Sequence, residues 1–256
     1  MAKPTQDAIE EMVDALADRE YPDWTLRERL AIGCRILAEN GQGSGLAGQY
    51  TARGEEPGTM WTLPYGMGFE EVKASDYLLV DDDLNVLKGG AKPNMANRFH
   101  LHVYRARSDI QAIVHTHPVH SSALSMIGEP LHVSHMDTAM LYDDVAFLPH
   151  WPGVPFGDEE GEIISEAIGD KNAILLARHG MMTAGPTVEA AGVMAVFFEH
   201  AARMQLLAMA AGKIKDIEPD LGKQAHDWRH APGAMATTFH YYARIALEKH
   251  SPVILD

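Results

Sequence analysis

The chain has 256 residues, of which 46% are hydrophobic, and a formal net charge of −15 from 36 acidic and 21 basic residues. This length and composition suffice for a complete core, so we expect a single domain over 1–256, with its core at about 25–211 and a C-terminal helical extension at 212–256. The acidic balance would repel a phosphate backbone, which excludes nucleic acid as an expected partner.

Cysteine content and hydropathy give expectations for the compartment. The single cysteine, Cys34, cannot form an intrachain disulfide, which agrees with a reducing environment. The N-terminus is charged rather than apolar, and no apolar run approaches the length needed to span a bilayer. We therefore expect a cytoplasmic protein without a membrane partner.

The first third of the chain predicts two helices and two hairpins. A short amphipathic helix at 7–16 precedes Thr25-Leu26-Arg27-Glu28, a capping box that opens a second helix. This helix should run to Asn40 and end at Gly41. Strand-like runs at 48–53 and 60–63, and again at 77–80 and 84–87, flank turn-forming residues and are typical of hairpins.

Helices and strands are mixed in the rest of the chain. Helices are expected at 97–107, 120–126, 159–168, from 185 to 211 and at 234–249, and strands at 110–114, 145–148 and 173–177. Hairpins outnumber regular strand-helix-strand units. The pattern therefore predicts an α/β fold, a three-layer α/β/α domain around a central mixed, largely antiparallel sheet.

The most informative motif is His115-Thr116-His117, which directly follows the apolar strand at 110–114. In an extended segment, residues i and i+2 point the same way, so the two imidazoles should converge. A second apolar strand, at 173–177, runs into Arg178-His179-Gly180. Three histidines at two strand ends would leave coordination positions open, as catalytic metal sites do.

Three segments, 99–107, 115–118 and 173–185, together resemble the class II aldolase/adducin family, in one order from about residue 25 to 211. In that family, the histidines of H-x-H and the histidine before glycine hold a divalent metal at a site shared between subunits of a homotetramer. The resemblance therefore implies that His115, His117 and His179 are metal ligands in a homotetramer. It implies zinc as the metal, with manganese or iron as alternatives.

The chain also departs from the family's sugar-phosphate aldolases, which carry a P/T-S-S-E segment whose Glu is the acid/base. Here the corresponding stretch is Pro93-Asn94-Met95-Ala96, and the methyl group of Ala96 cannot transfer a proton. Asn94 and Met95 replace the serines that would contact phosphate. The resemblance thus implies a fuculose-phosphate aldolase-like scaffold without its catalytic Glu and phosphate site.

Three neutral imidazoles would leave a bound dication its full charge, which suits a substrate that carries its own negative charge. We expect a metal-dependent carbon-carbon lyase, of aldolase or decarboxylase type, acting on a non-phosphorylated hydroxy or oxo acid. Decarboxylation requires no base to remove a hydroxyl proton, which agrees with the loss of the Glu. The alternatives are an Fe(II)-dependent oxygenase on the same scaffold and a non-catalytic adducin-like interaction module. The presence of all three histidines argues against the module, because adducin-type domains lose those ligands.

Other polar residues near these motifs are candidates for acid/base or binding roles. His135 and Asp137 lie in a loop that could reach the metal, and Met136 stands where fuculose-phosphate aldolase has its proton-donating Tyr. Arg178 could bind a substrate carboxylate or cap a helix. We take His135, Asp137 and Arg178 as the candidate catalytic residues. His120 is expected to be a satisfied, partly buried histidine, and residues 142–144 are expected to form a turn.

Overall fold

The computed structural model describes residues 6–17, 19–154, 157–250 and 252–256. The helices are α1 (Gln6–Ala17), α2 (Leu26–Leu37), α3 (Arg98–Ala106), α4 (Val119–Ile127), α5 (Asp158–Ile168), α6 (Val188–Ala211), α7 (Pro219–Arg229) and α8 (Ala234–His250). The strands are β1 (Gln49–Arg53), β2 (Thr59–Thr62), β3 (Leu78–Asp81), β4 (Val86–Lys88), β5 (Ala112–Thr116), β6 (Val145–Leu148), β7 (Ala173–Leu176) and β8 (Gly180–Gly185).

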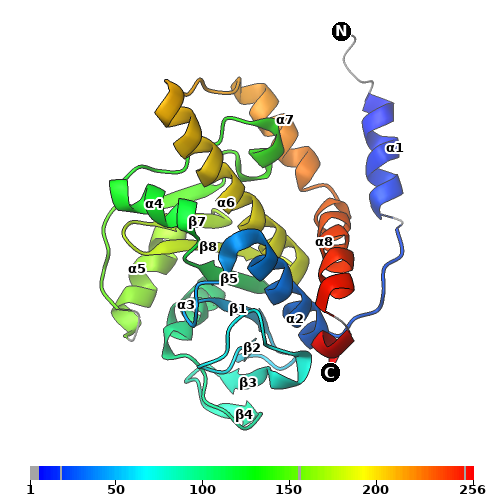
Figure 1. The fold of residues 1–256 in the computed structure, drawn as a ribbon, viewed down its shortest axis with the longest axis vertical. Helices are drawn as coiled ribbons and strands as arrows, with labels where there is room; N and C mark the ends of the chain where they lie inside the picture. The colour runs from blue at the N-terminus through cyan, green and yellow to red at the C-terminus, as the bar shows by residue number, and fades with distance from the viewer. Residues whose placement is uncertain (1–5, 18, 155–156, 251) are drawn as a thin grey trace.

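The strands form one eight-stranded sheet in the order β4-β3-β2-β1-β5-β8-β7-β6. Neighbouring strands are antiparallel except for β6 and β7, which are parallel. Helices lie on both faces of this sheet (Figure 1). The predicted three-layer α/β/α fold with a mixed, largely antiparallel sheet is confirmed.

Side chains alternate along the strands between two separate cores. On β5, Ala112 and Val114 belong to a core that includes α2, α6 and α8, whereas Ile113 between them belongs to a core that includes α3 and α5. This alternation follows from the period of two in an extended chain. Both faces of the central strands are therefore covered, which explains why these strands are continuous apolar runs in the sequence.

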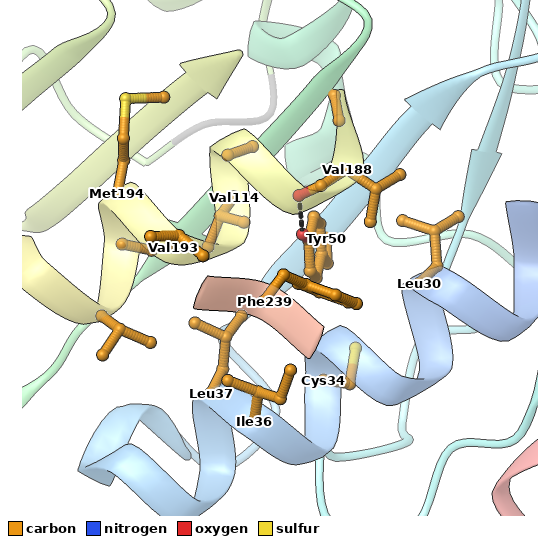
Figure 2. Packing of buried hydrophobic residues seen from close by; sticks show 14 of the residues in the cluster. Leu30, Cys34, Ile36, Leu37, Tyr50, Val114, Val188, Val193, Met194 and Phe239 are labelled. Atoms are coloured by element: carbon orange, nitrogen blue, oxygen red, sulfur yellow. Dashed lines mark hydrogen bonds between the residues drawn. The ribbon is translucent and has the colours of Figure 1, made fainter. Parts of the chain in front are cut away.

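Tyr50 on β1 shows how the larger core is joined. Its side chain is fully buried among residues of α2, α6 and α8, with Leu30, Val188 and Phe239 nearby (Figure 2). The phenol donates a hydrogen bond to the carbonyl oxygen of Val188, which opens α6. A buried hydroxyl needs such a partner, so this bond fixes the start of α6 over β1.

The helix α6 corrects one expectation about hydropathy. Val188–Ala211 has 24 residues and is long and apolar enough, by length and composition, to cross a membrane. The expectation that no apolar run approaches that length is therefore wrong. The helix packs against α2, α4, α8 and β8, so its apolar side chains form part of the core in this structure.

Several local predictions can now be compared with the structure. The capping box at Thr25 is confirmed, with both reciprocal hydrogen bonds to Glu28 present. The helix expected to end at Gly41 changes into a π-helical turn at Ala38–Gln42, in which Gly41 has a φ of +77°. Two elements, β8 and α7, were not predicted, and the segment at Met136–Leu141 is a 3₁₀ helix.

Candidate metal centre

His115 and His117 lie at the end of β5, in the middle of the sheet. His115 is in register with Gln49 on β1 and with Met182 on β8, so both neighbouring strands hold its backbone in place. The Nε2 atoms of His115 and His117 are 2.9 Å apart. The convergence predicted from the i, i+2 spacing is confirmed.

His179 reaches the same point from the tight turn between β7 and β8. Arg178 in that turn has a φ of +58°, a conformation that non-glycine residues adopt rarely. The ring of His179 lies 4.8 Å, centroid to centroid, from those of His115 and His117. The three histidines, which we call the triad, each offer a nitrogen, and these nitrogens all lie within 4.8 Å of one another.

The triad is held in the neutral form that metal binding requires. His115 Nδ1 donates to the carbonyl oxygen of Met181 at 2.9 Å, which leaves the lone pair on Nε2. Burial lowers the pKa of His115 well below its ordinary value, with the neighbouring histidines adding to the effect, and burial also lowers the pKa of His117. Burial lowers the pKa of His179 to about 4. The donor set therefore fits a divalent metal ion.

The triad opens into a pocket of about 820 Å³. Ala96, which the family resemblance aligns with the acid/base Glu, lines this pocket together with the three histidines. Most of the other walls are apolar, with Lys92 as the one basic side chain among the described lining residues; the apolar residues are Leu46, Ala47, Leu84, Pro93, Met95 and Val154. The pocket combines an imidazole floor with a largely apolar wall.

Two polar residues that sequence reasoning missed support the end of β5. The hydroxyl of Ser44 accepts the backbone N–H of His117 at 2.9 Å. The hydroxyl of Thr116 donates to Gln42 Oε1 at 2.6 Å, and Gln42 Nε2 in turn donates to the carbonyl oxygen of Ala195. These bonds join the strand to α6 and orient the two histidines. No local signal in the sequence pairs residues 42–44 with 116–117.

The three candidate catalytic residues are not among the described residues that line the triad pocket. Arg178 is exposed, and its backbone N–H donates to Ser125. His135 and Asp137 are also exposed, with the Asp137 N–H donated to His135 Nδ1 at 3.2 Å, and they line two other cavities. Within one chain the structure does not bring these residues to the triad.

His120 behaves as expected, as a partly buried histidine with a satisfied hydrogen bond. Its Nδ1 lies 2.7 Å from Glu199 Oε1, and the same carboxylate accepts the backbone N–H groups of His120 and Ser121 and the Ser121 hydroxyl. Glu199 on α6 thus satisfies the free N–H groups at the start of α4. This contact is structural and fixes the helix that follows the triad's strand.

The comparisons with known proteins agree with this fold and site. A family model described as the Class II Aldolase and Adducin N-terminal domain matches residues 28–206, and the chain belongs to this family. The decarboxylase NovR of Streptomyces niveus is 31% identical over 77% of this chain and 75% of its own. The 4-hydroxy-3-prenylphenylpyruvate oxygenase/4-hydroxy-3-prenylbenzoate synthase of Streptomyces roseochromogenus subsp. oscitans is 30% identical over 77% of this chain and 73% of its own.

A solved structure shows the same likeness in three dimensions. The L-fuculose 1-phosphate aldolase from Glaciozyma antarctica PI12 matches with a TM-score of 0.81 and 28% identity, covering 100% of this chain and 97% of that chain. Similarity to decarboxylases and aldolases indicates that this protein is an enzyme.

Proposed function

We propose that this protein is a metal-dependent carbon-carbon lyase, of decarboxylase rather than sugar-phosphate aldolase type, acting on a non-phosphorylated hydroxy or oxo acid. One observation carries the proposal: the neutral triad faces a pocket lined by Ala96, the residue that the family resemblance aligns with the acid/base Glu. Decarboxylation removes no hydroxyl proton, so it tolerates this loss better than aldol cleavage does.

The triad residues His115, His117 and His179 would hold a divalent ion, zinc first, with manganese or iron as alternatives. A bound ion would supply positive charge to the oxygen that takes up the electron pair of the broken carbon-carbon bond. The chain's own residues bind and orient the acid. Lys92 offers a cation to a substrate carboxylate, and the apolar wall holds an apolar body and excludes water.

We extend the proposal to the assembly. The protein acts as a cytoplasmic homotetramer with the triad pocket at a subunit interface. His135 and Asp137, which lie away from the pocket of their own chain, then act from a neighbouring subunit. The exposure of both side chains is consistent with such a role.

An Fe(II)-dependent oxygenase is the second candidate. The likeness to a protein named as a 4-hydroxy-3-prenylphenylpyruvate oxygenase favours it, since that name also describes an aromatic oxo acid as substrate. Neutral imidazoles with open positions suit Fe(II) as well. The intact triad disfavours the third candidate, a non-catalytic interaction module, because such a module has no use for three converging imidazoles.

A substrate screen tests the proposal. The full-length protein, loaded in turn with Zn²⁺, Mn²⁺ and Fe²⁺, is incubated with a panel of aromatic and aliphatic hydroxy and oxo acids, and product masses are measured. We expect loss of CO₂ from at least one acid, and no such loss with His117→Ala. Fuculose 1-phosphate and ribulose 5-phosphate serve as comparison substrates. Their turnover with a kcat/KM of about 10⁴ M⁻¹s⁻¹ or above would contradict the proposal.

A further inference from the structure

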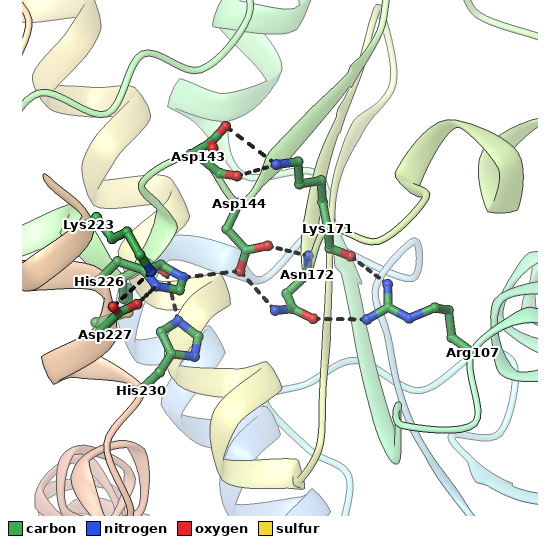
Figure 3. Close-up of polar contacts among 10 residues, drawn as sticks. Arg107, Asp143, Asp144, Lys171, Asn172, Lys223, His226, Asp227 and His230 are labelled. Carbon is green, nitrogen blue, oxygen red and sulfur yellow. Dashed lines mark hydrogen bonds and ion pairs between the residues drawn. The ribbon is translucent and has the colours of Figure 1, made fainter. Parts of the chain in front are cut away.

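We propose that Asp144, His226 and His230 form a second divalent-metal site, separate from the triad, which fastens α7 to the segment that enters β6. Figure 3 shows these side chains meeting between the helix and the sheet. Each of the three offers one ligand atom, and the three atoms all lie within 4.8 Å of one another. We call this group the α7 cluster.

The spacing within the α7 cluster fits a metal better than a hydrogen bond. His226 Nε2 lies 3.7 Å from Asp144 Oδ2, which is too long for a hydrogen bond. Two ligands on one tetrahedral zinc ion, with bonds of about 2.1 Å, are separated by about 3.4 Å. His226 and His230 are one helical turn apart, with ring centroids 4.3 Å apart, so both rings lie on the same side of α7.

His226 carries the strongest sign of a missing ligand. Its Nδ1 donates to Asp227 Oδ1 at 3.1 Å, so in the neutral ring the lone pair lies on Nε2, which faces Asp144 Oδ2 at 3.7 Å. Nε2 is buried and has no hydrogen-bond partner among the described residues. A carboxylate behind a histidine, with the other nitrogen left free, is the arrangement that orients metal-binding imidazoles.

The other two members are held in place as well. The side chain of Asp144 is only 10% exposed, and its two oxygens accept the backbone N–H and the Nδ2 of Asn172 at 2.8 and 2.9 Å. The ring of His230 is fixed by a bond of 2.9 Å from Nε2 to the carbonyl oxygen of Met140. These contacts hold Asp144 and His230 in place, whereas the ring of His226 stacks on that of His230 with 24° between their planes and would turn for both rings to face one ion. Two imidazoles and one carboxylate suit zinc and related borderline ions.

The position of the α7 cluster indicates a structural role. α7 lies beyond the residues matched by the family model, which end at 206, whereas Asp144 lies inside them. Gly222 on α7 packs so closely on the ring of Tyr142 that an added Cβ would lie 2.5 Å from Cε2. A metal bound here would therefore join the C-terminal extension to the sheet at a point where the two already meet tightly.

Zinc stoichiometry on the full-length chain tests this inference. Metal-free protein is dialysed against Zn²⁺ and the bound metal is measured by elemental analysis. We expect two equivalents for the wild type, one for His117→Ala, one for His226→Ala and none for the double variant. In the His117→Ala background, zinc should also raise the Tm, and this rise should disappear when His226→Gln is added.

His132→Ala is the matched control, because His132 pairs with a single exposed carboxylate, that of Asp216, at 2.6 Å. This variant should keep both equivalents. A wild type whose bound zinc is lost entirely in folded His117→Ala, or a folded His226→Ala that binds as much zinc as the wild type, overturns the inference. If His226→Ala does not fold, the zinc bound by His117→Ala decides the question. One equivalent supports the α7 cluster, and none contradicts it. If His226→Ala loses metal but His117→Ala does not, the α7 cluster is supported as a metal site and the proposed function, which needs metal at the triad, is contradicted.

Discussion

The triad and the α7 cluster both gather histidines, but the chain assembles them differently. The triad comes from β5 and the β7–β8 turn, neighbouring parts of one sheet, and the α7 cluster joins a helix to a loop far away in the sequence. The triad has no carboxylate and lines a pocket of about 820 Å³. The α7 cluster includes Asp144, whose side chain is 10% exposed.

The net charge of a bound ion and the access of a substrate to it would differ between the two sites, and both decide what the ion can do. An ion on three neutral imidazoles keeps its double charge and can act on an anionic substrate that enters the pocket. An ion on the α7 cluster would be partly neutralised by the buried carboxylate of Asp144, so it would act less strongly on an anionic substrate. The triad is therefore assigned to chemistry and the α7 cluster to stability.

The largest effect should separate the two sites in activity. We expect His117→Ala to lower kcat/KM on the acid found by the substrate screen by at least about 10³-fold, since the triad would lose its ion. His226→Ala should leave kcat/KM within about threefold and lower the Tm. Steady-state kinetics and thermal unfolding of both variants, with circular dichroism as a check of folding, measure this contrast. Equal losses of kcat/KM in the two variants would contradict the assignment of catalysis to the triad alone.

Two glycines allow a gentler version of the same test. An added Cβ at Gly180 would lie 2.5 Å from the carbonyl oxygen of Thr116 and from His117 Cδ2, so Gly180→Ala should displace His117. Zinc affinity of the triad should fall about 10- to 100-fold, the usual loss when a ligand's support is disturbed. Gly222→Ala should instead weaken the α7 cluster, although alanine favours a helix by up to about 1 kcal/mol. Competition with a chromophoric chelator measures the zinc affinity of each site. If Gly180→Ala weakened only the α7 cluster, or Gly222→Ala only the triad, the placement of the two sites would be refuted.

Glu160 on α5 belongs to neither cluster. It tests whether burial without any partner is enough to shift the pKa of an ionisable side chain. Burial raises the pKa of Glu160 to about 7, and both carboxyl oxygens lack hydrogen-bond partners among the described residues. The native state therefore holds a proton that the unfolded chain releases near pH 4.5, and stability falls as the pH rises from about 4.5 to 7.

Glu160→Gln removes that cost. We expect the free energy of unfolding to exceed that of the wild type by about 1–3 kcal/mol at pH 8 and to match it near pH 4.5. Denaturant titrations at the two pH values check this, with the exposed Glu162→Gln as a control on the same helix. A constant difference across the pH range would show that the carboxyl is not buried as described.

The smallest effect concerns the missing acid/base. Ala96→Glu restores a carboxylate beside the triad, where it would partly neutralise the ion and repel an anionic acid, so turnover should be unchanged or a few-fold lower. Ala96→Gln is the uncharged control. Steady-state kinetics decide the matter. A tenfold gain with Glu, about 1.4 kcal/mol of transition-state stabilisation, would show that proton transfer limits the reaction and would favour an aldolase.

The sequence predicted the triad because its signals are local. The i, i+2 spacing of His115 and His117 and the apolar strands before each histidine segment have a direct geometric meaning in a sheet. The capping box at Thr25 is equally local. These features depend on neighbours within a few residues, so they could be predicted without knowledge of the fold.

The features that could not be predicted depend on tertiary structure or carry no turn signal. β8 follows β7 through a turn in which Arg178, not glycine, takes the positive φ, so nothing in the sequence marks a new strand. α7 is polar overall, and its few apolar side chains, Leu221, Ala225 and Trp228, give only a weak helical pattern. Asp144, expected to be a turn residue, was therefore not connected with His226 and His230. The support from Gln42 and Ser44 likewise exists only in the folded chain.

The most direct test of the account is turnover by metal-free protein to which metal is returned in the absence of O₂. Protein stripped by a chelator is assayed with its acid substrate under nitrogen, before and after addition of Zn²⁺, Mn²⁺ or Fe²⁺, and CO₂ is measured. We predict no turnover without metal and full recovery on addition of at least one of the ions, with no need for O₂. Turnover without metal would contradict the metal dependence. Absence of turnover under nitrogen with every ion, together with turnover and stoichiometric O₂ consumption by the Fe²⁺-loaded protein in air, would contradict the assignment as a lyase.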